Sequence, residues 1–563
     1  MIIPVDLHAF LECLLALCRQ SQPAPSFEVI TVPATSDVRV SALLQSLNTP
    51  FRLRVASQPQ NGARDALRRA SDVAVGRFCL VIDSARDVRR DLLAAHLRVQ
   101  HGTGGVVACG IEQEALRSDN ASARQPSSQA GIGAPRQGGE TASWWDCAEG
   151  HLSLPRALLE AETAVPLLAE HHRGLELGYR LSQHEALRFV SAPDAGGKGT
   201  PSPSFSRIMV EADARGCESV LLYHHYPAML AHLELSKFNE ANFRQVQTRR
   251  LLLATRLPPR LLALLAKVLR VPNSSNRWHR FLQSYSYWWG VRRALSNRDT
   301  WKRLTRGPVI LMYHAIGGAD ESAGYYIVPE RRFARQMAWL RWNRYHVLGL
   351  DELISYRREY RLPPARSVVI TFDDGYADNR SRAYPLLRKN GFPATIFLVS
   401  RAVGATNDWD TEGELAGRSL LSLAEVREML RGGVQFGAHT RHHVSLTKVS
   451  TQRAITEIAG SRSDLEHGLG VPVTTFAYPF GTHDLATQAT VEQAGFTGAC
   501  CSLSGINDPL VPIYALRRVE VRGTDPPARF VLGLWWGRRH IMHGRRVSTG
   551  LTGYKRAQRS TCA

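Results

Sequence analysis

The sequence predicts an α/β protein with more than one domain, each built on a mostly parallel sheet. Short apolar segments alternate with helical segments in both halves of the chain, which is the pattern of parallel sheets covered by helices. With 563 residues the chain is too long for one ordinary domain. The apolar segment Val368–Phe372 ends at Asp373, Asp374 and Gly375, and α/β folds place their chemistry at such carboxyl ends of strands.

The amino-terminal part is expected to alternate short strands with helices. The expected strands are Ile2–Val5, Phe27–Val32, Phe51–Val55, Phe78–Ile82 and Gly105–Cys109, and the expected helices are Leu7–Cys18 and Gly62–Ala74. Residues 118–142 and 192–206 are rich in Ser, Gly and Pro. This composition predicts two flexible insertions.

The middle of the chain, residues 215–305, is expected to be helical and basic. Leu251–Leu269 holds nine leucines with Arg and Lys between them, and Trp278–Arg293 sets aromatic residues beside arginines. Such rings and cations suit the boundary between a membrane and water. An ordinary helical hairpin with solvated arginines is the alternative.

From residue 308 onward the alternation of strands and helices is regular. The expected strands are Val309–Met312, Val368–Phe372, Ala394–Val399, Val434–Phe436 and one through Phe476, and the expected helices are Glu330–Trp342, Ser381–Lys389, Leu423–Leu430, Thr451–Leu469 and Leu485–Ala494. Gly391 and Gly495 follow two of these helices, where glycine commonly ends a helix in a left-handed conformation.

Composition limits the class of partner. The formal net charge of +20 predicts an anionic partner, and without a zinc-finger or helix-turn-helix pattern a membrane surface or acidic polymer is favoured over nucleic acid. The nine cysteines form no CxxC pair, so reduced thiols are expected. We see no signal peptide or transmembrane run. The expected location is the cytoplasm or the cytoplasmic face of a membrane.

Two later elements add to the carboxylates that follow Val368–Phe372. His439 and His443 lie four residues apart after a short strand, and on a helical turn they would share a face and could bind one metal ion. Thr475–Gly481 is another short strand that runs into a Pro/Gly turn. Together these elements supply carboxylates, imidazoles and backbone N–H groups.

These elements resemble the motifs of the polysaccharide deacetylase family (carbohydrate esterase family four, NodB-like). The resembling segments are Leu311–His314, Thr371–Gly375, His439–His443 and Phe476–Gly481, and the resemblance runs from about 308 to 525. It implies a distorted (β/α) barrel of the polysaccharide deacetylase type, a bound divalent metal, and removal of an N- or O-linked acetyl group from a sugar.

The resemblance also implies roles for individual residues. The metal ligands would be Asp374, His439 and His443, with zinc as the expected ion. Asp373 would act as general base, and a backbone N–H near Phe480 would stabilise the oxyanion. The residues expected to contact substrate are Tyr376, Tyr478 and Arg518.

The sequence departs from the family pattern at two places. Ala477 stands where many members carry an arginine that holds the base, and Tyr514–Val519 lacks the late histidine that serves as acid. His314 is then the candidate general acid, with His442 and His483 as further choices. Because the family's general acid is missing here, the sequence does not distinguish an amide substrate from an ester substrate.

The amino-terminal part resembles family 2 glycosyltransferases, which have a Rossmann-like (glycosyltransferase-A) fold. Glu176–Leu181 matches a helix of that family, but the nucleotide-binding and catalytic positions differ: the second strand ends at Ala34, the acidic cluster reads Asp83-Ser84-Ala85, and Gly174 replaces the base. A lone carboxylate is a poor site for a divalent cation. The resemblance implies a degenerate domain, for which a nucleotide sugar is not expected.

These expectations divide the chain into four regions and give one leading function with two alternatives. The regions are a glycosyltransferase-like domain (1–214, with the insertion 118–142), a basic helical connector (215–305), a deacetylase domain (306–525) and a basic tail (526–563). The leading function is metal-dependent deacetylation of an acetylated polysaccharide or lipid-linked sugar. The alternatives are a bifunctional glycosyltransferase and deacetylase, and a scaffold without catalysis that binds a glycan or a membrane.

Overall fold

The computed structural model divides the chain into two compact units. Unit 1 comprises residues 1–305 with two short later segments, and unit 2 holds the remainder of the chain. The residues that the structure describes are 2–3, 7–23, 26–32, 46–56, 65–83, 88–103, 107–109, 142–148, 151–192, 205–241, 243–268 and 276–537. The expected insertion 118–142, except its last residue, and the basic tail beyond residue 537 lie outside these ranges.

Unit 1 begins with a seven-stranded sheet in the order β3-β2-β1-β4-β6-β5-β7. The pairs among β1 to β4 are parallel, and β6 runs antiparallel to both of its neighbours. The strands are β1 (Ile2–Ile3), β2 (Glu28–Thr31), β3 (Arg52–Val55), β4 (Phe78–Asp83), β5 (Val107–Cys109), β6 (Leu152–Pro155) and β7 (Phe189–Ser191). The expected mostly parallel sheet is therefore present.

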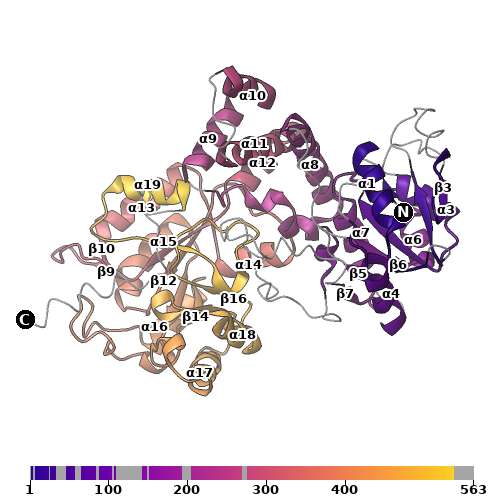
Figure 1. Ribbon diagram of the computed structural model, residues 1–563. Coiled ribbons are helices and arrows are strands. Elements are labelled where there is room, and N and C mark those ends of the chain that lie inside the picture. Colours follow the sequence, from indigo (N-terminus) through magenta and orange to yellow (C-terminus); the bar gives the residue numbers. More distant parts are fainter. Residues whose placement is uncertain are drawn as a thin grey trace, which may run out of the picture. The chain divides into compact units, whose positions relative to one another are not determined.

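Helices cover both faces of this sheet (Figure 1). Val29 packs in a cluster with α1 and α4, whereas Ile30, the next residue of β2, packs in a second cluster with α3 and α6. Alternate residues of a strand point to opposite faces, so each face has its own apolar core. The helices are α1 (Leu7–Cys18), α3 (Ala66–Val73), α4 (Leu92–Thr103), η3 (Trp144–Ala148), α6 (Arg156–Thr163) and α7 (Arg173–Ser182).

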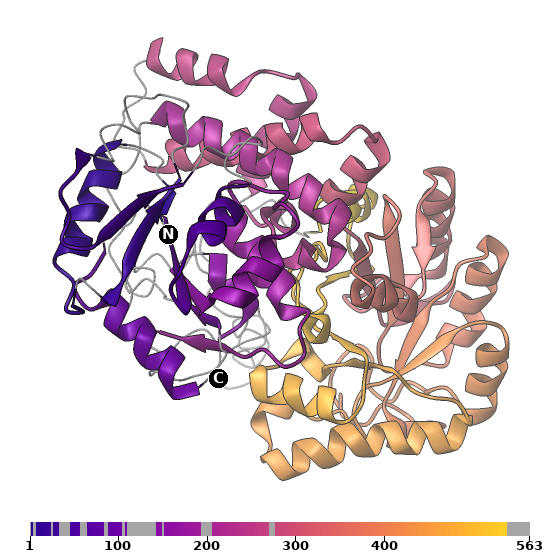
Figure 2. The ribbon, with the colours of Figure 1, turned by 90° about the vertical axis from the view of Figure 1, so that its right-hand side faces the viewer.

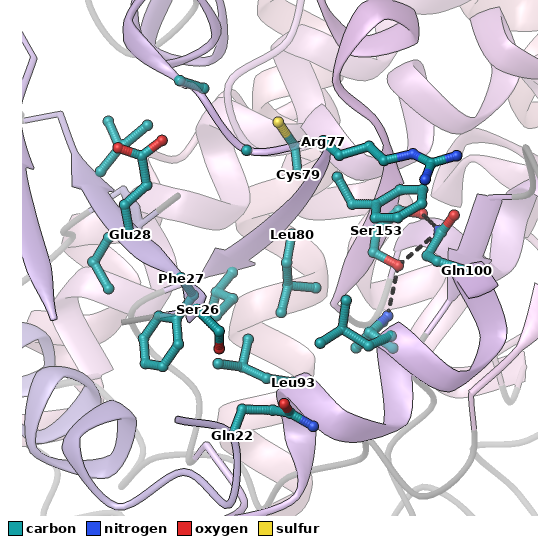
Figure 3. Close-up of a pocket in the computed structure, with 18 of the residues that line it drawn as sticks. Gln22, Ser26, Phe27, Glu28, Arg77, Cys79, Leu80, Leu93, Gln100 and Ser153 are labelled. Carbon is teal, nitrogen blue, oxygen red and sulfur yellow. Dashed lines mark hydrogen bonds between the residues drawn. The ribbon is translucent and has the colours of Figure 1, made fainter. Parts of the chain in front are cut away.

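A pocket of about 320 Å³ opens at the amino-terminal ends of β2 and β4. The short strand β1 pairs only with Thr31 of β2 and the end of β4, so no described strand lies between their first halves. Figure 3 shows Phe27 and Glu28 across the pocket from the hydrogen-bonded Gln100 and Ser153. The pocket thus lies at the amino-terminal ends of these strands, opposite to the carboxyl ends where α/β folds bind their ligands.

Between residues 205 and 305, the described part of unit 1 is mainly helical. The helices are α8 (Phe205–His225), η5 (Pro227–His232), η6 (Glu234–Lys237), α9 (Phe243–Ala254), α10 (Pro259–Val268), α11 (Asn276–Ala294) and α12 (Arg298–Thr305). Helices α8 and α11 pack closely: a side chain at Gly216 of α8 would meet the backbone of Tyr287, and one at Gly290 of α11 would meet that of Asp213. Tyr285, Tyr287 and Trp288 of α11 are buried within this helical segment.

Unit 2 contains a nearly closed barrel of parallel strands. Its eight-stranded sheet has the order β16-β15-β14-β13-β12-β8-β17, with β11 also paired to β12. A parallel bridge between Cys500 and Leu516 joins the two ends of this order. The strands are β8 (Val309–Tyr313), β11 (His346–Leu348), β12 (Ser367–Phe372), β13 (Thr395–Leu398), β14 (Gln435–Ala438), β15 (Thr475–Ala477), β16 (Gly498–Cys500) and β17 (Arg518–Glu520). The α/β fold class and the barrel expected for this part are confirmed.

Helices cover the outside of the barrel (Figures 1 and 2). They are α13 (Glu330–Trp342), α14 (Leu350–Arg358), a π-helical turn (Asn379–Ala383) that leads into α15 (Tyr384–Asn390), α16 (Leu423–Arg431), α17 (Thr451–Leu469), α18 (Leu485–Gln493) and α19 (Pro527–Trp536). A separate parallel pair consists of β9 (Ala315–Gly317) and β10 (Ile327–Pro329). Short 3₁₀ helices are η8 (Ser400–Ala402), η9 (Leu446–Lys448), η10 (Pro479–Gly481) and η11 (Ile513–Ala515).

Sequence and structure agree closely on element positions. Leu7–Cys18, Glu330–Trp342 and Thr451–Leu469 are helices with the predicted bounds, and Gly391 is the left-handed residue that ends α15. In the described ranges, every helix falls short of the length or apolarity that crossing a membrane requires.

Candidate metal centre

The two carboxylates stand at the carboxyl end of the buried strand β12. All six residues of β12 are buried, and Asp373 continues the ladder by donating its N–H to the carbonyl of Tyr313. The backbone then reverses through two left-handed residues, Asp374 (φ 70°) and Gly375 (φ 76°). A Cβ at Gly375 would lie 2.5 Å from the Leu398 side chain. Only glycine fits both the turn and the space.

The two histidines follow strand β14, which is separated from β12 by β13 in the sheet. His439 stands directly after β14, and both Thr440 (φ 64°) and His443 (φ 53°) adopt left-handed conformations. The expected helical turn between the histidines is therefore wrong, because residues 439–445 form an irregular loop. The loop nevertheless brings the imidazoles together, with the ring centroids of His439 and His443 5.0 Å apart.

Unusual backbone angles are concentrated here. Among the described residues, eight other than glycine have a positive φ, and four of them are Asp374, Thr440, His443 and Phe480. Left-handed conformations cost energy for residues with a Cβ, and they persist where the surroundings hold them, as at functional sites. These four residues come from three different loops that follow β12, β14 and β15.

Asp374, His439 and His443 form a donor set that fits a metal ion. Oδ1 of Asp374 lies 3.5 Å from Nε2 of His439 and 3.3 Å from Nε2 of His443. Two ligands on one tetrahedral ion with bonds of ~2.1 Å stand roughly 3.4 Å apart. Oδ1 of Asp374 is buried without a hydrogen-bond partner, so an ion would satisfy an otherwise unpaired oxygen.

The protonation states of the two imidazoles also suit metal binding. Nδ1 of His439 donates to the carbonyl of Ala477 at 2.8 Å, which leaves the lone pair on Nε2, the nitrogen that faces Asp374. Burial lowers the pKa of His439 to about 4 and that of His443 to about 3. Burial also raises the pKa of Asp374. Neutral imidazoles beside a buried carboxylate are the ligands that zinc and similar divalent ions take.

Asp373 is held by Arg518 instead of by the metal set. The Arg518 guanidinium donates to both carboxylate oxygens of Asp373, at 2.6 and 2.8 Å, and its Nε donates to the carbonyl of Cys501. Burial alone would raise the pKa of Asp373, but Arg518, with His439, outweighs it and holds the pKa at about 2. Asp373 is therefore ionised, and its orientation is fixed by a two-point contact.

His314 stands after β8 on the same side of the barrel. Its charge would influence the pKa values of both Asp373 and Asp374. Its carbonyl accepts a hydrogen bond from Nδ2 of Asn379 at 2.9 Å, and its ring lies 4.6 Å from that of Tyr326. His314 is half-buried.

A buried charge network lies next to this segment. Asp378 accepts the N–H of Ile316 at 2.6 Å and Nε of Arg418 at 2.7 Å, and Arg418 also pairs with Glu321. The network ties the β9 backbone to the loop that precedes α16.

Aromatic rings flank His443. The Trp409 ring stacks on the imidazole at 4.8 Å, and the Phe480 ring meets it edge-on at 4.8 Å. Phe480 is half exposed.

Sequence patterns did not predict Trp409 or the neighbouring Asn407, whose Nδ2 donates to the Tyr376 hydroxyl at 2.8 Å. The short polar run Asn407-Asp408-Trp409-Asp410 was the available signal, but it contains no pattern that points to a particular site.

The three residues expected to contact substrate are buried. Tyr376 and Tyr478 have 0% exposure and Arg518 has 1%. The Tyr376 hydroxyl faces Asp374, the Tyr478 hydroxyl donates to the carbonyl of Tyr514, and Arg518 is engaged by Asp373. All three side chains therefore lie behind the surface of the site, and their contact with substrate stays a prediction.

The alternative acids have partners of their own. His442 pairs with Glu457 at 2.9 Å, and His483 binds the carbonyl of Gly481 and stacks on Tyr478. Among the described residues, neither His442 nor His483 forms a hydrogen bond or ion pair with Asp373 or Asp374. His314 has the better position.

In unit 1, part of the expected degenerate site is described. Gly174 lies in α7, and Glu176 accepts hydrogen bonds from the backbone of Leu168 and Ala169 and pairs with Arg180. Glu176 thus has a structural role in holding a loop. Ala34 and residues 84–85 lie outside the described residues.

Comparison with known proteins places this site in a family. Residues 361–499 match the family described as polysaccharide deacetylase. YxkH of Bacillus subtilis (strain 168), which carries that family name, is 30% identical over 212 residues, or 38% of this chain and 70% of the relative. A poly-β-1,6-N-acetyl-D-glucosamine N-deacetylase of Staphylococcus aureus (strain N315) is 30% identical over 30% of this chain and 59% of its own length. This chain therefore spans less than two thirds of that second relative.

Two solved structures each match about two fifths of this chain. A Streptococcus pyogenes deacetylase, PplD in complex with acetate, is 24% identical with a TM-score of 0.36, over 41% of this chain and 98% of that one. IcaB from Ammonifex degensii is 25% identical with a TM-score of 0.36, over 41% of this chain and 97% of that one.

Proposed function

Because this chain belongs to the polysaccharide deacetylase family, hydrolases that act on carbon–nitrogen bonds other than peptide bonds, we propose that unit 2 removes acetyl groups from an N-acetylated glycan or lipid-linked sugar. The observation that carries the proposal is the convergence of Asp374, His439 and His443 beside an ionised Asp373. The S. aureus relative acts on poly-β-1,6-N-acetyl-D-glucosamine, which supports an amino-sugar polymer as substrate.

A divalent ion, with zinc as the preferred choice, would be held by Asp374, His439 and His443. The donor set supports this, because three protein ligands leave positions open for water and substrate. When bound, the ion would lower the pKa of water and polarise the acetyl carbonyl. The Tyr376 hydroxyl and the Ala477 carbonyl orient two of the ligands from behind.

The chain's own residues carry the remaining steps. Asp373 accepts the proton of the attacking water as general base, and Arg518 keeps its carboxylate oriented. The backbone N–H near Phe480, at the left-handed turn after β15, donates to the developing oxyanion. His314 then donates a proton to the leaving nitrogen. Arg518 thus takes the part of the arginine that many family members carry at the position of Ala477, because it holds the general base.

Within unit 1, residues 1–214 are proposed to be a glycosyltransferase-like domain without its chemistry, and residues 215–305 the basic connector. The parallel strands β1 to β4 with helices on both faces support a Rossmann-like fold. The structural use of Glu176 and the glycine at position 174 support loss of transfer. We propose the boundaries 1–214, 306–525 and 526–563 for the other regions.

Acetate release tests the proposal for unit 2. The purified chain is incubated with β-1,6-linked and β-1,4-linked N-acetylglucosamine oligomers and with an O-acetylated xylan, and acetate is measured in each case. We expect release from at least one N-acetylated oligomer at a rate above that from the ester. Equal inactivity of the chain and of its Asp373→Asn variant on all substrates, in the presence of zinc, would favour the scaffold alternative.

A further inference from the structure

One stretch of unit 1 contains basic residues but no acidic ones. Between Glu240 and Asp299 the sequence has twelve arginine and lysine residues and no aspartate or glutamate. The chain as a whole has 70 basic and 50 acidic residues, so this stretch carries charge equal to more than half of the net +20. Helices α9, α10 and α11 lie within it. A helical surface that is merely solvated normally mixes the two signs.

Some of these cations are used within the fold and others face solvent. Arg249 donates to Ser284 at 2.7 Å, and Arg293 pairs with Asp213 at 2.7 Å. Arg256, Arg260 and Arg298 are exposed. Burial lowers the pKa of Arg292, and the nearby Arg256 and Arg298 lower it further. At least three cations therefore lie close enough to repel one another, which an anionic partner would relieve.

Exposed leucines occupy the same helices. Leu251 at the end of α9 is 66% exposed, and Leu261 and Leu264 of α10 are 47% and 55% exposed. Leu253 and Leu262, on the other faces of the two helices, are buried. Leu261 and Leu264 are three residues apart and share a face. Figures 1 and 2 show α10 at the outer rim of the helical segment.

Three aromatic residues of α11 do not form this surface. Tyr285, Tyr287 and Trp288 are at most 2% exposed and pack inside the helical segment. These three rings therefore do not meet a membrane boundary, whereas Trp278, Phe281 and Trp289 of the same helix are half-buried. The exposed apolar groups are the leucines of α9 and α10.

We propose that α9 and α10 form a surface that binds an anionic phospholipid bilayer. The surface consists of Leu251, Leu261 and Leu264 with Arg256 and Arg260. Leucines enter the boundary between headgroups and acyl chains, and arginines bind the lipid phosphates. Exposed leucines distinguish this surface from one built for nucleic acid, where stacking rings and cations contribute the binding. The proposal stands apart from the acetyl chemistry of unit 2.

Co-sedimentation with vesicles tests this surface in the full chain. Vesicles of phosphatidylcholine with roughly one third phosphatidylglycerol are compared with pure phosphatidylcholine, because electrostatic attraction needs anionic lipid and weakens with salt. We expect binding to the anionic vesicles at low salt and little binding to the neutral ones. Absence of binding to the anionic vesicles would overturn the proposal.

Matched variants separate the two contributions. Leu261→Ser/Leu264→Ser and Arg256→Glu/Arg260→Glu are each expected to lower the partition coefficient by about tenfold or more. Arg335→Glu/Arg431→Glu changes the charge equally at exposed positions of unit 2 and is expected to bind like the unaltered chain. Full binding by the leucine variant would indicate a general polyanion contact, tested with polyphosphate, and would overturn the bilayer proposal. An unchanged thermal unfolding curve and an unchanged circular dichroism spectrum show that each variant is folded.

Discussion

The guanidinium of Arg518 and the carboxylate of Asp373 form a two-point ion pair, with N···O distances of 2.6 and 2.8 Å, in which both side chains are almost wholly buried. Arg518 begins β17 and Asp373 follows β12, and both strands pair with β8. A contact between residues 145 positions apart thus fixes the proposed general base. The contribution of this ion pair to stability depends on both partners being present, because either charge alone would be buried without compensation.

Stability measurements on single and double variants are expected to show this dependence. Arg518→Met leaves the Asp373 carboxylate buried and unpaired, and should lower the free energy of unfolding by about 3–5 kcal/mol. Adding Asp373→Asn removes the stranded charge and should recover part of that loss. Urea denaturation of the four proteins gives the coupling energy. Simple additivity of the two changes would contradict the interpretation of the contact as a coupled pair.

Arg518→Lys is expected to lower turnover without removing the metal. Lysine keeps the charge but cannot make two parallel hydrogen bonds, so Asp373 loses its fixed orientation. We expect kcat to fall by about tenfold or more, while KM changes by less than about threefold. Arg517→Lys, at the neighbouring half-buried position, is the control. Wild-type kcat in Arg518→Lys would show that the two-point contact is not needed for turnover.

His314→Asn is expected to affect amide and ester substrates differently. An amine leaving group needs a proton, whereas the 4-nitrophenolate of an activated ester does not. Loss of the acid should therefore slow amide hydrolysis by roughly 10²-fold or more and hydrolysis of 4-nitrophenyl acetate far less. Parallel rate measurements on the two substrates give the ratio. Equal slowing of both would assign His314 to another role.

Gly375→Ala is expected to destabilise unit 2 more than Gly391→Ala. Both glycines have a positive φ, 76° and 67°, but only at Gly375 would a Cβ meet another side chain. Gly391→Ala should therefore cost only the backbone strain, about 1 kcal/mol, and Gly375→Ala should cost about 1–3 kcal/mol more. Thermal unfolding of the two variants makes the comparison. Similar melting temperatures would mean that the Leu398 side chain moves aside at little cost.

Local sequence patterns predicted much of the barrel. The apolar runs fixed β8 and β12 to within one residue, and helical periodicity fixed α13 and α17. These elements are defined by their own residues, since alternation and capping are short-range signals. The donor set also emerged from the sequence, because Asp374, His439 and His443 sit at strand ends that a parallel barrel brings together.

Contacts that depend on long-range packing were not predictable. Nothing local to Arg518 indicates that its side chain turns inward to Asp373, and nothing near Trp409 indicates that it stacks on His443. The spacing of His439 and His443 fitted a helical turn, but left-handed residues at 440 and 443 make a loop. Such conformations are set by the surroundings, because they oppose the local preference of the residues.

The most direct measurement counts metal ions and turnover together. Metal-depleted protein is titrated with zinc, and bound metal and acetate release are measured on the same samples. We expect one ion per unaltered chain with activity rising in proportion, one ion without activity in Asp373→Asn, and neither in His439→Ala. Full acetate release by the metal-depleted protein, or normal zinc binding by His439→Ala, would contradict a metal centre built on Asp374, His439 and His443.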